Sequence, residues 1–166
     1  IQQEILLIKK FKKKKLNHLR SGSAFMKREL GIARCGLACC LCSENETCTG
    51  CDSGQCPDKE WCENRKCSIS KNVEYCYECN EHCRKGLLSK IKPYAFTEFV
   101  KRYGINCLLD CLERNEKNGI IYHREGIHGD YDEFDDIETL IEYIKTGDSS
   151  LKNCRDFQTA SLHRND

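Results

Sequence analysis

Twelve of the fifteen cysteines of this chain fall in one segment, residues 35–83, and their spacing is typical of metal ligands. Three pairs in the segment are separated by two residues, which lets both sulfurs of a pair turn back on one tetrahedral ion. Two such pairs complete a site of four thiolates. We expect the following ten cysteines to be the metal ligands: Cys35, Cys39, Cys42, Cys48, Cys51, Cys62, Cys67, Cys76, Cys79 and Cys83.

The spacing leaves the partition of these thiols among ions open. Twelve thiols could fill up to three four-thiolate sites, and we expect two such sites, with Cys40 and Cys56 outside them. His82 adjoins Cys83 and is an alternative ligand. Cys107 and Cys111 stand four residues apart on a predicted helix and could chelate together, but buried cysteine is the commoner case.

Zinc is the metal that we expect, and a [4Fe–4S] cluster is the alternative. Cys35, Cys39 and Cys42 have the spacing that holds such a cluster in radical enzymes. The chain is too short for the barrel of those enzymes, and Leu41 stands where they usually carry an aromatic residue. Thiol redox chemistry is a third possibility, although no thioredoxin-like context surrounds the pairs. No hydrolase triad or phosphate loop is present, so we assign no catalytic residue and favour a structural or interaction module over an enzyme.

The high cysteine content also fits a secreted disulfide scaffold. No secretory signal is visible, the number of cysteines is odd, and the chain is long enough to fold without such staples. No apolar run is long enough to span a membrane. We therefore expect a reduced, cytoplasmic protein that has no membrane partner.

Residues 1–25 contain seven Lys/Arg and one Glu, so they differ from the rest of the chain in charge. We expect them to be a non-native or disordered basic leader ahead of Met26, the only methionine. The alternative is a basic amphipathic arm for a membrane or nucleic acid. Without the leader, the formal net charge falls from +1 to −5.

Beyond Cys83 the sequence resembles ordinary α+β structure. Hydrophobic periodicity predicts a helix over 93–103, a second over 105–117, and a third over 137–146 with Asp135 and Glu138 as its capping box. Residues 120–122 are expected to form a short strand.

The expected fold is thus a small α+β protein with a cysteine-rich, metal-stapled N-terminal half of short irregular elements, followed by three helices and a short strand. We divide it into a metal-binding module at 26–87, a helical α+β segment at 88–147 and a flexible tail at 148–166. An unknown protein partner is expected to use the loop 122–132, which carries Tyr122, His123, His128 and Tyr131.

Several motifs of the cysteine segment together resemble the cysteine-rich bacterial family known as domain of unknown function 3795. They are Cys35-Gly36-Leu37-Ala38-Cys39 with Cys42, Cys48-Thr49-Gly50-Cys51, Cys62-x4-Cys67 enclosing Arg65, and Val73-Glu74-x-Cys76-x2-Cys79. The resemblance covers Gly31 to Leu87 and implies a bacterial zinc protein without implying an activity. The chain departs from the family pattern by adding Cys40 and by carrying Asn64 where an aliphatic residue is expected.

The charges predict that the protein is a monomer or weak dimer that binds no nucleic acid. Residues 35–83 carry nine acidic and four basic side chains, a net charge of −5 before any thiolate is counted. Phosphate binding requires a basic face, because counterion release supplies most of the affinity. We expect a chain starting at Met26 to show no micromolar binding to a generic oligonucleotide at physiological salt, as measured by fluorescence anisotropy. Binding at that strength would contradict the prediction.

Overall fold

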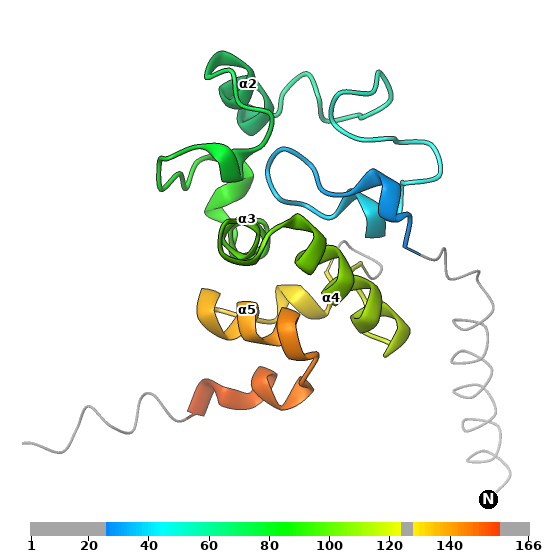
Figure 1. Cartoon of the computed structure of the whole chain (residues 1–166), viewed down its shortest axis with the longest axis vertical. Coiled ribbons are helices and arrows are strands. Elements are labelled where there is room, and N and C mark those ends of the chain that lie inside the picture. The colour runs from blue at the N-terminus through cyan, green and yellow to red at the C-terminus, as the bar shows by residue number, and fades with distance from the viewer. Residues whose placement is uncertain (1–25, 124–127, 157–166) are drawn as a thin grey trace, which may run out of the picture.

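The computed structural model describes residues 26–123 and 128–156, so the predicted leader lies outside the described residues. The described part contains four α-helices, six short 3-10 helices and no strand (Figure 1). The predicted α+β class is therefore wrong, because this part of the protein is helical. None of the described helices is long and apolar enough to cross a lipid bilayer.

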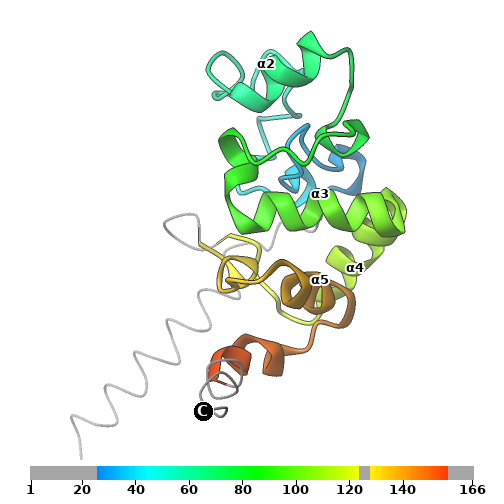
Figure 2. The same cartoon turned by 90° about the vertical axis from the view of Figure 1, so that its left-hand side faces the viewer.

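Three of the helices pack against one another and form the helical half of the protein (Figure 2). They are α3 (Ile91–Tyr103), α4 (Ile105–Lys117) and α5 (Ile137–Thr146), which confirms the three helices predicted from periodicity. Six of their apolar side chains are completely buried in the shared core: Phe96, Phe99, Leu108, Leu112, Leu140 and Ile144. Burial of such side chains contributes about 1.5–3 kcal/mol each, so these helices supply most of a hydrophobic core. Ile32, Ala38 and Cys40 of the cysteine half belong to the same core.

The cap of α5 differs from the predicted capping box by one residue. Asp136 precedes the helix, and its carboxylate accepts hydrogen bonds from the backbone N–H of Thr139, at 2.7 Å, and from the Thr139 hydroxyl. Glu138 instead forms an ion pair with Arg102 of α3. The helix ends at Gly147, which has a positive φ of 70°.

The predicted strand at 120–122 is wrong because no second strand lies beside it among the described residues. The backbone N–H of Ile121 donates to the side-chain carboxylate of Asp130 at 2.6 Å, and the Ile121 carbonyl accepts from the Asp130 N–H at 2.7 Å. The N–H of Ile120 donates to the Asn115 carbonyl at the end of α4. Asp130, through its carboxylate and its backbone N–H, and the end of α4 therefore satisfy the polar groups that a strand would offer to a neighbour.

Two aromatic residues of the loop predicted to meet a partner contribute to the core, and residues 124–127 of that loop lie outside the described residues. Tyr122 and Tyr131 are 4% and 1% exposed, and both rings pack beside Phe96 of α3. Their aromatic faces are therefore unavailable to a partner. Beyond α5, Leu151 of the 3-10 helix η6 (Ser149–Asp156) also packs against the core, so the first part of the predicted tail contributes to the fold. Residues 157–166 of that tail lie outside the described residues.

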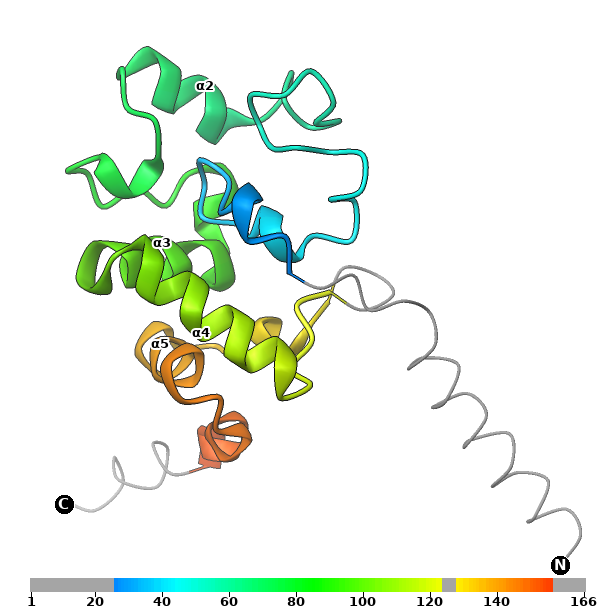
Figure 3. The same ribbon diagram turned by 45° about the vertical axis from the view of Figure 1, so that its right-hand side comes forward.

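The cysteine half, residues 26–87, lies on one side of α3 and consists mostly of loops (Figure 3). Its one α-helix, α2 (Glu63–Ser70), was not predicted from the sequence. The two side chains that α2 buries are Asn64 and Ser68, which are polar. An apolar periodicity could therefore not reveal this helix.

The turn at Cys35–Gly36 is where the cysteine half lies directly against α3. Gly36 has a φ of 90°, which disfavours any side chain, and a Cβ placed on it would lie 2.5 Å from the Thr97 hydroxyl and 2.6 Å from the Pro93 carbonyl oxygen. The Thr97 hydroxyl donates to the Pro93 carbonyl and, at 3.4 Å, to the Cys35 carbonyl. The glycine of the Cys-Gly-Leu motif is thus required by a close contact between backbones.

We expect Gly36→Ala to lower the free energy of unfolding by about 2 kcal/mol or more, because it adds both a steric clash and a strained φ. Gly54→Ala is the matched control, since a Cβ there meets no atom within 4 Å. The control should change stability by less than about 0.5 kcal/mol. Urea unfolding followed by circular dichroism measures both variants, and equal stability of the two would contradict the close contact.

Candidate metal centre

Seven cysteines from the cysteine half line one cavity of about 120 Å³. They are Cys35, Cys39, Cys42, Cys48, Cys51, Cys56 and Cys62. Tyr122 and His123, which follow α4 in the helical half, line the same cavity. The fold therefore brings thiols from residues 35–62 and the imidazole of His123 to the same cavity.

The remaining predicted ligands form a second group, which consists of Cys67, Cys76, Cys79 and Cys83. Burial, together with the nearby thiols of Cys83, Cys67, Cys79 and the cavity residue Cys62, raises the pKa of the Cys76 thiol to about 11. Cys67 lies on α2, whereas Cys76 begins the 3-10 helix η3 (Cys76–Glu78). The ammonium of Lys71 lies 3.8 Å from the Cys79 sulfur, which places a positive charge beside this group.

Cys40 and Cys56 were predicted to lie outside the metal sites, and only one of them lines the cavity. Cys40 is fully buried in the hydrophobic core and does not line the cavity, as expected of an outsider. Cys56 lines the cavity with the predicted ligands. On α4, Cys111 is buried as predicted for an apolar cysteine, whereas Cys107 is exposed.

The described thiols lie near one another, but they are not arranged as the coordination shell of a metal ion. Every cysteine whose side chain is described is free of disulfide bonds. In the same part of the chain, no three His, Cys, Asp or Glu side chains are already arranged to hold a metal ion. The chain between Cys42 and Cys62, which carries several of the cavity thiols, contains no α-helix.

Burial disfavours the thiolate form of the cavity cysteines in this arrangement. It raises the pKa of Cys35 to about 12, and it raises the pKa of Cys39 strongly, with a further contribution from the nearby thiols of Cys51, Cys35 and Cys42. An ion that binds here must therefore displace protons and offset the negative charge of the thiolates. The His123 imidazole also has a lowered pKa, because it is partly buried and lies near Lys92.

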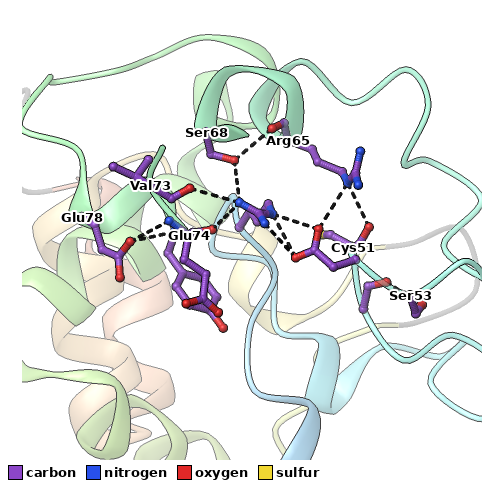
Figure 4. Close-up of polar contacts among 11 residues, drawn as sticks. Cys51, Ser53, Arg65, Ser68, Val73, Glu74 and Glu78 are labelled. Atoms are coloured by element: carbon purple, nitrogen blue, oxygen red, sulfur yellow. Dashed lines mark hydrogen bonds and ion pairs between the residues drawn. The ribbon is translucent and has the colours of Figure 1, made fainter. Parts of the chain in front are cut away.

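Arg34 joins the segments that carry the two thiol groups. Figure 4 labels three of its partners, Ser68, Val73 and Glu74. Its guanidinium donates to the hydroxyl of Ser68 on α2 and to the carbonyls of Val73 and Glu74, all at 2.9–3.1 Å. It also forms an ion pair with Asp52 at 2.9 Å. The role of Arg34 could not be predicted from the sequence, because its partners lie up to 40 positions away and no motif links them.

Asn64 is a second residue whose role could not be predicted. It is 2% exposed, and its amide group donates to the Lys85 carbonyl and accepts from the Leu87 N–H at 2.8 Å. These bonds hold α2 against the 3-10 helix η4 (Gly86–Ser89). The aliphatic residue expected at this position could not make them.

Comparisons with protein-family models, with curated proteins and with solved structures found no match for this chain. The resemblance to domain of unknown function 3795 therefore stays a prediction.

We expect Arg34→Met to lower the free energy of unfolding by about 2 kcal/mol, because hydrogen bonds to a charged group contribute about 1.5–3 kcal/mol and the exposed pair with Asp52 adds little. Arg84→Met is the control, since Arg84 is exposed and stacks on the Tyr94 ring at 4.1 Å. Its loss should cost less than about 1 kcal/mol. Thermal and urea unfolding test the pair of variants, and a larger effect at Arg84 would contradict the role of Arg34.

Proposed function

We propose that this chain is a zinc-binding protein in which two groups of thiolates hold ions that stabilise the cysteine half. In this proposal the protein is a structural or interaction module and not an enzyme. The observation that carries the proposal is that residues 41–87 bury very few apolar side chains. Only four side chains of this segment are buried, namely Asn45, Cys62, Asn64 and Ser68, and three of them are polar.

So little apolar burial cannot offset the cost of ordering the segment. Fixing the backbone of one residue costs about 1–2 kcal/mol, whereas a fully buried apolar side chain returns about 1.5–3 kcal/mol. Structural zinc contributes on the order of 10 kcal/mol or more to folding. Ions bound by the gathered thiols would supply the stabilisation that the side chains of this segment do not.

The two thiol groups suggest how the ions are divided. Cys67, Cys76, Cys79 and Cys83 provide one complete set of four thiolates. The seven cavity cysteines provide more than enough donors for another ion. We therefore propose at least two zinc ions per chain, with Cys40 excluded from both.

An iron–sulfur cluster is the second candidate, and one observation favours it. Cys35, Cys39 and Cys42, which have the spacing of cluster ligands, all line the same cavity. In this alternative the protein would act in electron transfer or as an accessory to an enzyme.

Location and partners follow from the same proposal. The free thiols of the described cysteines are consistent with a reducing compartment, and we propose a cytoplasmic protein. The acidic cysteine half supports a protein partner and argues against nucleic acid.

The full chain, purified without oxygen, should contain at least two zinc ions, no inorganic sulfide and no visible absorption. Metal analysis and a visible spectrum test this directly, because iron–sulfur clusters absorb visible light and zinc does not. Stoichiometric iron and sulfide would replace the zinc proposal by the cluster proposal. A chain that contains neither metal would contradict both.

Two cysteine variants provide the control for that measurement. Cys62→Ser changes a buried thiol of the cavity and should lose at least one ion, while Cys107→Ser changes an exposed thiol on α4 and should keep the full metal content. Equal metal content in the two variants would show that the cavity thiol is not a ligand.

A further inference from the structure

We infer that His123 is a ligand of the ion held in the cavity, so that a residue of the helical half completes a site built mainly by the cysteine half. This inference rests on the proposed function, and it names a ligand that the cysteine spacing does not include.

The position of His123 is the first argument. Its half-buried ring lines the same cavity as the seven thiols, although it lies far from them in the sequence. The backbone N–H of Ser43, which directly follows Cys42, donates to His123 Nδ1 at 3.4 Å. The imidazole is therefore directed at the turn that carries one of the predicted ligands.

The neighbouring Tyr122 holds the backbone of His123 in place. The Tyr122 hydroxyl accepts a hydrogen bond of 2.9 Å from the Ala38 N–H, in the turn between Cys35 and Cys39. The rings of Tyr122 and His123 are 4.5 Å apart between centroids. Because Tyr122 is 4% exposed and packed against Phe96, the imidazole next to it has a defined location at the cavity.

The hydrogen-bonding state of the ring is the second argument. A nitrogen that accepts a hydrogen bond carries no proton, so Nδ1 has the electron pair that a metal bond requires once the bond from Ser43 is released. The bond from Ser43 is long at 3.4 Å and therefore weak. Exchanging it for a zinc–nitrogen bond of about 2.0 Å loses little and adds a neutral donor among thiolates that repel one another.

The other histidines of the described chain do not share this position. His82 and His128 are both exposed, and neither lines the cavity. His82 adjoins Cys83 in the second thiol group, and His128 follows His123 in the same connection between α4 and α5. These two residues provide matched controls, one beside a thiol and one close in sequence.

A bound ion with this ligand would join the two halves of the protein. Ser43 and His123 are 80 positions apart, and Tyr122, which precedes His123, packs beside Phe96 of α3 and Tyr131. The ion would thus hold the turn after Cys42 against the helical half. Loss of the metal would affect this junction as well as the cysteine loops.

The test uses the full chain, labelled with nitrogen-15 in its histidine rings and loaded with cadmium-113 in place of zinc. Direct bonding splits the signal of the bound ring nitrogen by coupling to cadmium. We expect one coupled imidazole, whose splitting disappears in His123→Ala and persists in His82→Ala and His128→Ala. His123→Ala should also bind zinc at least about tenfold more weakly in competition with a chelator, a loss no smaller than that of an outer-shell partner.

Each other result contradicts a specific part of the account. Cadmium bound with no coupled imidazole, or a splitting that disappears only in His82→Ala, would overturn the role of His123 and leave the proposed function intact. A chain that binds no cadmium would overturn the proposed function itself. The splitting in the unaltered protein is informative even if His123→Ala fails to fold.

Discussion

Residues 41–87 of the cysteine half bury almost no apolar side chains, and this constraint shapes the rest of the structure. Residues 41–87 bury one apolar side chain, Cys62, and three polar ones. A segment of this kind holds its shape through backbone turns, through polar side chains that reach across it and, in our proposal, through metal ions. The helical half is the opposite case, since α3, α4 and α5 share a core of fully buried Phe, Leu and Ile side chains.

The two halves are joined by a shared hydrophobic cluster, which includes Ile32, Ala38 and Cys40, and by close polar contacts. Gly36 allows the Cys35 turn to lie against Pro93 and Thr97 of α3, and the Tyr122 hydroxyl accepts a hydrogen bond from Ala38. Within the cysteine half, Arg34 connects the N-terminal turn with α2 and the segment before η3. These contacts bring the predicted ligands near one another without forming a coordination shell. The arrangement suits a site in which binding of the ion draws the nearby thiolates into a complete coordination shell.

The features that the sequence predicted are those with a local signal. Apolar residues three and four positions apart predicted α3, α4 and α5, and cysteine spacing predicted a set of thiols that the structure gathers into two groups. Helix α2 was missed because the residues it buries, Asn64 and Ser68, are polar. The strand at 120–122 was wrong because Asp130 takes the place of a neighbouring strand. His123 and Arg34 depend on contacts between distant segments, which no spacing within one segment can show.

Amide hydrogen exchange, compared before and after removal of metal from the reduced full chain at neutral pH, tests the central claim most directly. Our account predicts that peptides from residues 41–87 lose their protection, because the segment has no core to hold it once the ions are gone. Peptides from the interior of α3, α4 and α5 should keep most of theirs, since these helices bury apolar side chains against one another. Unchanged protection of residues 41–87 after complete removal of metal would contradict the account.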